Sequence, residues 1–196
     1  RHNVPCLWAF HKVHHSALSL TPLTIFRTHP IEIFVFSMRS IAVRAGLIAT
    51  FIFFFGEGVD LITVLGVNVG LFIFHLLGSN LRHSHIYISY WGWLEKWLIS
   101  PAQHQLHHSV DPNHHGKNLG ITLAIWDRLC GTLLVAPKNL RLKFGFEVEE
   151  QKRVGTLRYV YFDSFIESLC SLINFIIRGP FIMFKKRKPV SYTHLT

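Results

Sequence analysis

Two short segments of the chain carry the same cluster of three histidines. The first cluster, in Phe10–Ser16 (FHKVHHS), is His11, His14 and His15, and the second, in Ser100–Ser109 (SPAQHQLHHS), is His104, His107 and His108. On an α-helix, residues at positions i, i+3 and i+4 lie on one face, so each segment projects three imidazoles in one direction. Two such faces, on two helices, can surround a pair of metal ions.

The number and type of these side chains indicate which chemistry they serve. Imidazole is a ligand for zinc, copper, iron and nickel, and a single zinc site takes about three or four ligands. Six clustered imidazoles therefore indicate two metals. The chain contains no Glu-x-x-His pair and no His-Glu-x-x-His motif, which argues against carboxylate-bridged di-iron bundles and zinc proteases. A nitrogen-rich dinuclear site beside a membrane suits activation of O2 on two irons and attack on a lipid C–H bond.

The composition indicates that this site belongs to a membrane protein. The chain has 196 residues, 49% of them hydrophobic and only 16% charged, with 17 Phe, whereas a soluble domain usually carries about 25% charged residues. The net charge of +9 flanks apolar segments, so we interpret it as a membrane-surface and topology signal and not as a nucleic-acid interface. The three cysteines are scattered, which argues against disulfides and fits a reducing, cytosol-facing environment.

The elements that must position the histidines are predicted to be helices. Pro5 can begin a helix that continues to Ser16, and Pro101 opens the helix of the second cluster. Between them, Phe34–Phe55 is an apolar run long enough to span a bilayer, and Leu61–Leu77 is a second run after a Gly-Glu-Gly turn. The two runs predict a transmembrane helical hairpin with its turn on the side of the membrane opposite the histidines.

The charges near the first run predict the orientation of the hairpin. Arg39 and Arg44 lie at the histidine end of the run, which places the histidine clusters in the cytosol by the positive-inside tendency. His75, within the second run, is interpreted as a core histidine. The density of aromatic residues from Tyr87 to Trp97 predicts a belt at the lipid headgroups.

Other segments carry candidate residues around the site. One of His83 and His85, more readily His83, points at the metal pocket, and the other is either a ligand in a locally unwound turn or a polar surface residue. His29 is either a donor that orients a ligand, or a cap or interface residue. Asn118 and Asp127 are polar groups placed to orient metal-bound imidazoles, whereas His114 and His115 lie in an Asp-Pro-Asn turn. Lys138–Lys152 is predicted as a loop or short strand, and Val160–Phe184 as an amphipathic interfacial helix.

The segments HKVHHS, SPAQHQLHHS and KNLG…WDRLCGTL together resemble the fatty acid hydroxylase superfamily, specifically bacterial sterol desaturase-like proteins. That family has an H-x-x-x-H box followed by two H-x-x-H-H boxes. The segment THPIE also resembles the family's H-P-x-E segment, and the resemblance covers nearly all of residues 1–137. His2, which the residues alone suggest is a surface histidine, precedes Pro5-Cys6-Leu7-Trp8 as the family's first box does. The metal ligands that the resemblance implies are His2, His11, His14, His15, His83, His104, His107 and His108.

The resemblance implies an all-α integral-membrane protein in which a cytosolic helical cap carries a histidine-rich dinuclear metal site. Its implied activity is O2-dependent hydroxylation or desaturation of a lipid on two Fe ions. Each turnover needs two electrons, and since no haem or flavin motif is present, a separate ferredoxin, b-type cytochrome or reductase is implied.

The domain limits and the competing functions complete the expectations. We expect a single domain over residues 1–189, N-terminally truncated so that the other histidine of the first box lies upstream, and a non-native tail over 190–196. A membrane metal transporter or metal sensor, or a structural membrane protein whose histidines bind nothing, are the alternatives. A transporter predicts ionisable groups forming a path inside the spans, and in the sequence only His75 and Asn68 stand there.

Overall fold

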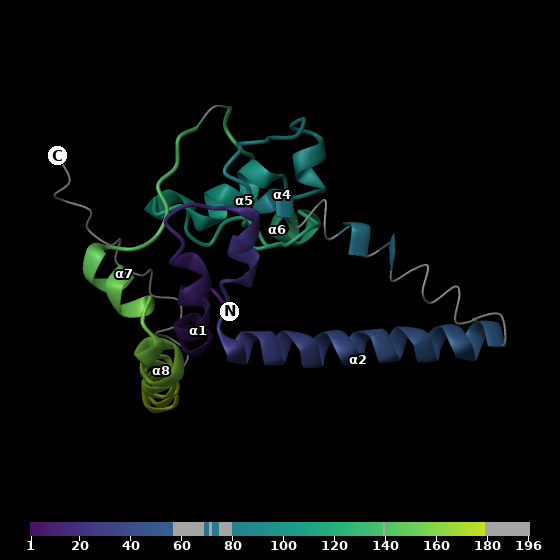
Figure 1. The fold of residues 1–196 in the computed structure, drawn as a ribbon. Helices are drawn as coiled ribbons and strands as arrows, with labels where there is room; N and C mark the ends of the chain where they lie inside the picture. The colour runs from purple at the N-terminus through teal and green to yellow at the C-terminus, as the bar shows by residue number, and fades with distance from the viewer. Residues whose placement is uncertain (57–68, 71, 75–79, 139, 179–196) are drawn as a thin grey trace.

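The structure is a computed structural model that describes residues 1–56, 69–70, 72–74, 80–138 and 140–178 (Figure 1). Within these ranges it is helical, and its only β-type pairings are the isolated bridges Leu98–Leu123 and Ser109–Phe144. The helices are α1 (Pro5–His15), η1 (Pro22–Phe26), α2 (Pro30–Phe55), α4 (Asn80–Arg82), η4 (Leu94–Lys96), α5 (Pro101–His108), η5 (Pro112–His114), α6 (Ile125–Leu129), α7 (Val148–Val154), the π-helix η6 (Tyr159–Asp163) and α8 (Ser164–Arg178). The predicted helical class is therefore confirmed for the described chain.

Helix α2 runs outward from the rest of the molecule as a single long rod (Figure 1). It begins at Pro30, four residues before the predicted start at Phe34, because proline fits a first helical turn and the ring of His29 accepts a hydrogen bond from the Ile31 N–H at 3.1 Å. None of its 26 residues is buried, and its length of about 39 Å exceeds the roughly 30 Å of a bilayer's hydrocarbon core.

Within the described residues, two helical segments are long and apolar enough to cross a membrane, namely Pro30–Phe55 and Tyr159–Ile177. The predicted second run, Leu61–Leu77, the turn before it and His75 lie wholly or mostly outside the described residues, so the hairpin stays a prediction. The segment 190–196 also lies outside them.

The histidine-bearing helix α1 packs against α8 (Figure 1). Lys12 of α1 pairs with Glu150 at 2.9 Å and with Glu167 at 3.0 Å, and Arg153 pairs with both carboxylates. The hydroxyl of Tyr159 donates a hydrogen bond to Glu167 at 3.1 Å. These pairs turn the polar side of α8 toward α1 and leave its large apolar side chains exposed, which is the amphipathic pattern predicted for this segment.

The prediction of a loop or strand over Lys138–Lys152 is wrong at its C-terminal end, where α7 begins at Val148. The helix is stabilised by the Arg153–Glu150 pair at i and i+3 and by the contact of Val154 with Val13 and Tyr159 in a small apolar core. The contact between Val154 and Val13 joins residues more than 130 positions apart, so the local sequence pattern of a polar segment could not predict it.

Candidate metal centre

Helix α5 is held in place by a capping box at its N-terminus. The Ser100 hydroxyl accepts a hydrogen bond from the Gln103 N–H at 3.1 Å, and the Gln103 side chain accepts one from the Ser100 N–H at 3.0 Å. The buried carboxylate of Glu95 accepts from the Ser100 hydroxyl at 2.7 Å. All eight residues of α5 are buried, so the rotation of this helix, and with it the direction of its imidazoles, is fixed.

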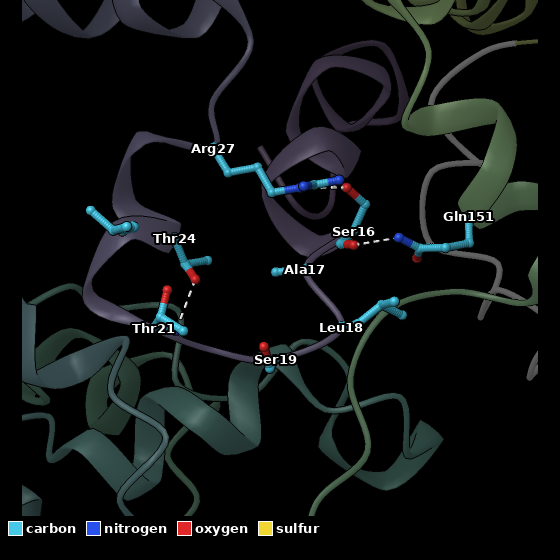
Figure 2. Close-up of a pocket in the computed structure, with 9 residues that line it drawn as sticks. Ser16, Ala17, Leu18, Ser19, Thr21, Thr24, Arg27 and Gln151 are labelled. Carbon is cyan, nitrogen blue, oxygen red and sulfur yellow. Dashed lines mark hydrogen bonds between the residues drawn. The ribbon is translucent and has the colours of Figure 1, made fainter.

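The C-terminal end of α1 is held from two sides (Figure 2). The Arg27 Nε–H donates to the Ser16 hydroxyl at 2.9 Å and to the Val13 carbonyl at 3.1 Å, while the Gln151 amide donates to the Ser16 carbonyl at 2.6 Å. These bonds, to Val13 before the two histidines and to Ser16 after them, fix the helix end that carries His14 and His15.

Helices α1 and α5 carry six histidines, which together with His2 and His83 form two clusters of four. The ligand-capable nitrogens within each cluster lie within 4.8 Å of one another. The first cluster is His2, His11, His15 and His107, and the second is His14, His83, His104 and His108. These are the eight histidines that the family resemblance selected.

Each helix contributes to both clusters. On a helix, residue i+4 lies about 40° around the axis from residue i, and residue i+3 lies about 60° to the other side. His11 and His15 therefore enter the first cluster as a pair, and His14 enters the second. Helix α5 does the reverse, since its i, i+4 pair joins the second cluster and its i+3 residue the first. Each helix thus gives two histidines to one cluster and one to the other. His2 is the fourth member of the first cluster, and His83 is the fourth member of the second.

The nitrogen separations fit metal coordination. In the second cluster the Nε2 atoms of His14 and His83 lie 3.1 Å apart, and those of His83 and His104 3.0 Å apart. In the first, the Nε2 atoms of His2 and His15 are separated by 3.2 Å. A metal about 2.1 Å from each imidazole nitrogen places neighbouring ligands about 3.0 Å apart in octahedral and about 3.4 Å apart in tetrahedral geometry. The donor set therefore fits one metal ion in each cluster.

The two clusters lie side by side. The rings of His15 and His108 stack with their centroids 4.3 Å apart, although they belong to different clusters. The rings of His11 and His14 stack at 5.4 Å across the same boundary. Because the clusters share these ring contacts, the eight imidazoles form one continuous group and not two separate sites.

Hydrogen bonds on the outer side of the rings assign the tautomers. The Nδ1–H of His11 donates to Glu32 Oε1 at 2.9 Å, that of His107 to the Lys117 carbonyl at 3.0 Å, and that of His14 to the Arg27 carbonyl at 3.3 Å. A proton on Nδ1 leaves the Nε2 lone pair directed into the cluster, which is the form that binds a metal.

Burial keeps the imidazoles neutral. Desolvation lowers the pKa of His14 to about 3, against an ordinary value of 6.5. Burial likewise lowers the pKa values of His2, His11, His15, His104, His107 and His108. Since metals bind the neutral ring, the pocket is prepared for metal at neutral pH without a proton having to leave.

Within the described residues, the hydrogen bonds of Asn118 and Asp127 go to the backbone and to Thr132, and not to an imidazole. Asp127 accepts from the N–H groups of Leu119 and Gly120, both at 2.7 Å. Asn118 holds a left-handed backbone (φ 50°) and bonds to the Gln103 carbonyl at 3.1 Å. Both residues thus fix the backbone after Lys117, whose carbonyl receives His107. Their predicted orienting role would act through the backbone and not by contact.

Of the other candidates, His85 is exposed whereas His83 is buried within the second cluster. The ring of His29 is buried between the N-terminus of α2 and the Val160 carbonyl, 2.6 Å away, which makes it a cap and a link between elements. His114 contacts the Ser109 hydroxyl at 3.0 Å. Glu32 was not predicted from the sequence as the hydrogen-bond partner of His11. The H-P-x-E pattern that contains Glu32 could have indicated it.

A helical protein with two adjoining clusters of four imidazoles and an exposed apolar helix long enough to cross a membrane defines a class of histidine-rich helical proteins. Within that class, the sequence profile of the fatty acid hydroxylase family matches residues 1–132, and the chain belongs to this family. The family predicted from the histidine boxes is therefore confirmed.

Two relatives are alkylglycerol monooxygenases. The protein from Xenopus tropicalis is 29% identical over 144 residues and that from Danio rerio 28% identical over 144 residues, in each case 74% of this chain and 28% of the relative. The chain thus spans about a quarter of the length of these relatives. No solved structure matches the chain.

Proposed function

We propose that the protein is an O2-dependent di-iron oxygenase that hydroxylates or desaturates a C–H bond of a membrane lipid. The observation that carries the proposal is the pair of adjoining clusters, each with four imidazole nitrogens within 4.8 Å of one another. Membership of the fatty acid hydroxylase family and similarity to two monooxygenases support an oxidative reaction on a lipid.

The residues of the chain would hold one iron in each cluster. Iron bound there would supply activation of O2 and oxidative attack on an unactivated C–H bond. Seven of the eight imidazoles are buried and His2 is partly buried, so the protein excludes bulk water from the reacting centre. The outer hydrogen bonds of His11, His14 and His107 hold these rings in the metal-binding tautomer, which orients them before any metal arrives.

The apolar surfaces support a lipid substrate and a membrane location. Helix α2 exposes apolar side chains along its whole length, and Tyr159–Ile177 is a second candidate span. Both adjoin the cap that carries the clusters. We propose that the substrate reaches the centre from the bilayer, that the centre faces the cytosol, and that a separate ferredoxin, b-type cytochrome or reductase delivers the two electrons of each turnover.

Metal analysis of the full-length protein tests the proposal. Purified in detergent after aerobic growth with iron, the wild type should contain about two irons per chain, and His107→Ala should contain less. His114→Ala is the matched control, since His114 lies in neither cluster. One zinc and no iron in the wild type would contradict the proposal and favour a metal-sensing or metal-transport function.

Labelled oxygen distinguishes the two outcomes of the reaction. Cells that express the protein would be exposed to 18O2 and their sterols, fatty acyl lipids and alkylglycerols compared with those of cells that express His107→Ala. Hydroxylation places one labelled oxygen in the product, whereas desaturation removes two hydrogens and leaves no label. A lipid profile identical to that of the variant for all three classes would contradict an oxygenase acting on these lipids.

A further inference from the structure

Glu32 places a carboxylate against one of the two clusters. Its Oε1 accepts a hydrogen bond from His11 Nδ1–H at 2.9 Å and another from Arg1 at 3.0 Å. The side chain is only 10% exposed. The second oxygen, Oε2, is buried and has no hydrogen-bond partner among the described residues.

Such a carboxylate is costly to keep without a compensating charge. A buried polar atom without a hydrogen bond carries a desolvation cost that is larger still when the group is charged. Among the described residues, the Arg1 guanidinium pairs with this carboxylate, but its side chain is 38% exposed and it shares the oxygen that His11 already occupies. A metal cation held by His11 would supply the missing compensation through the ring.

The second cluster has different surroundings. His14 donates its Nδ1–H to a neutral carbonyl, that of Arg27, at the longer distance of 3.3 Å. His104 Nδ1 is buried without a hydrogen-bond partner among the described residues. A carboxylate that accepts from a ligand imidazole makes that ring a stronger donor to a metal, whereas a neutral carbonyl does so less and a missing partner not at all.

We propose, on the basis of the di-iron function above, that Glu32 is a positioning residue that makes the two metal positions inequivalent. It fixes the tautomer of His11 and adds negative charge beside the first cluster. Iron in that cluster is held more tightly and is the more readily oxidised of the two. The iron in the second cluster, among His14, His83, His104 and His108, is the more labile and the more easily reduced.

The wild type alone offers a first test. Full-length protein loaded with 57Fe should give two distinct quadrupole doublets in its Mössbauer spectrum, and a redox titration should show two separate reduction steps. One doublet and one reduction step in a protein that holds two irons would overturn the proposal. This measurement does not depend on whether any variant folds.

Glu32→Gln tests the role of the charge. Glutamine keeps an oxygen that can accept from His11 but removes the negative charge. We expect one doublet to change while the other stays, and one of the two irons to pass to a chelator about 10–100-fold faster. Unchanged doublets and unchanged release rates would overturn the proposal.

Two controls separate the charge at His11 from other effects. Glu149→Gln makes the same chemical change at a side chain that is 93% exposed, and it should leave both irons unaffected. Arg1→Ala removes the ion pair but keeps the bond between Glu32 and His11. If Arg1→Ala reproduced the spectrum of Glu32→Gln, the ion pair would be responsible and the proposal would be overturned. A wild type without iron would instead reject the di-iron function itself.

Discussion

Replacing Asp127 by Asn tests whether the backbone behind the metal centre is held by one buried carboxylate. Asp127 is 2% exposed, and its two oxygens accept from Leu119 N–H and Gly120 N–H at 2.7 Å and from the Thr132 hydroxyl at 2.6 Å. In Asp127→Asn one oxygen becomes an NH2 group. The backbone N–H that it faced then meets a donor in place of an acceptor.

The expected magnitude follows from these bonds. A hydrogen bond to a charged group contributes about 1.5–3 kcal/mol, roughly twice a neutral one. The substitution removes one such bond and weakens the other two, so we expect a loss of about 3 kcal/mol in the free energy of unfolding. For a chain of this size that corresponds to a melting temperature about 6–12 °C lower.

Thermal unfolding of the full-length protein in detergent, followed by circular dichroism, measures this change. Asp163→Asn is the matched control, because Asp163 bonds to Arg158, whose side chain is 82% exposed, and such pairs contribute little. A second readout is metal release, since the segment that Asp127 holds follows Lys117, whose carbonyl orients His107. If the melting temperatures of Asp127→Asn and Asp163→Asn differed by less than about 1 °C, the reasoning would be refuted.

Three further predictions concern the clusters and their support. His83→Ala should lower the iron content toward about one per chain, while His85→Ala should not change it, because only His83 lies in a cluster; equal metal contents would count against this assignment. Gly120→Ala should destabilise the protein in a melting experiment, since a Cβ there would lie 2.6 Å from the Leu123 carbonyl oxygen. The metal-free protein should lose stability in denaturant titrations as the pH falls below about 6.5, where the unfolded chain binds protons that buried imidazoles such as His14, with a pKa of about 3, do not; a flat profile would contradict the burial of neutral rings.

Local sequence patterns predicted the parts of this protein that depend on neighbouring residues. Pro5 and Pro101 begin the two histidine helices, as expected from the tolerance of proline in a first turn. The i, i+3, i+4 spacing places three imidazoles on each helix face, and an apolar run of sufficient length gives α2. Helical periodicity is a property of consecutive residues, so these features, and with them the family, could be predicted from the sequence.

The tertiary structure decided which of the two clusters each imidazole belongs to. The contact of His14 with His83 joins residues 69 positions apart, and the sequence did not decide between His83 and His85. The partnership of Glu32 with His11 bridges two separate helices. Asp127 and Asn118 act on the backbone because of how the chain folds over α5, which no local spacing encodes. The sequence determined the kinds of ligand and the helices that carry them. The contacts between the histidine rings of α1 and α5 decided how the imidazoles divide into two clusters, because contacts between distant segments carry no signature within either segment.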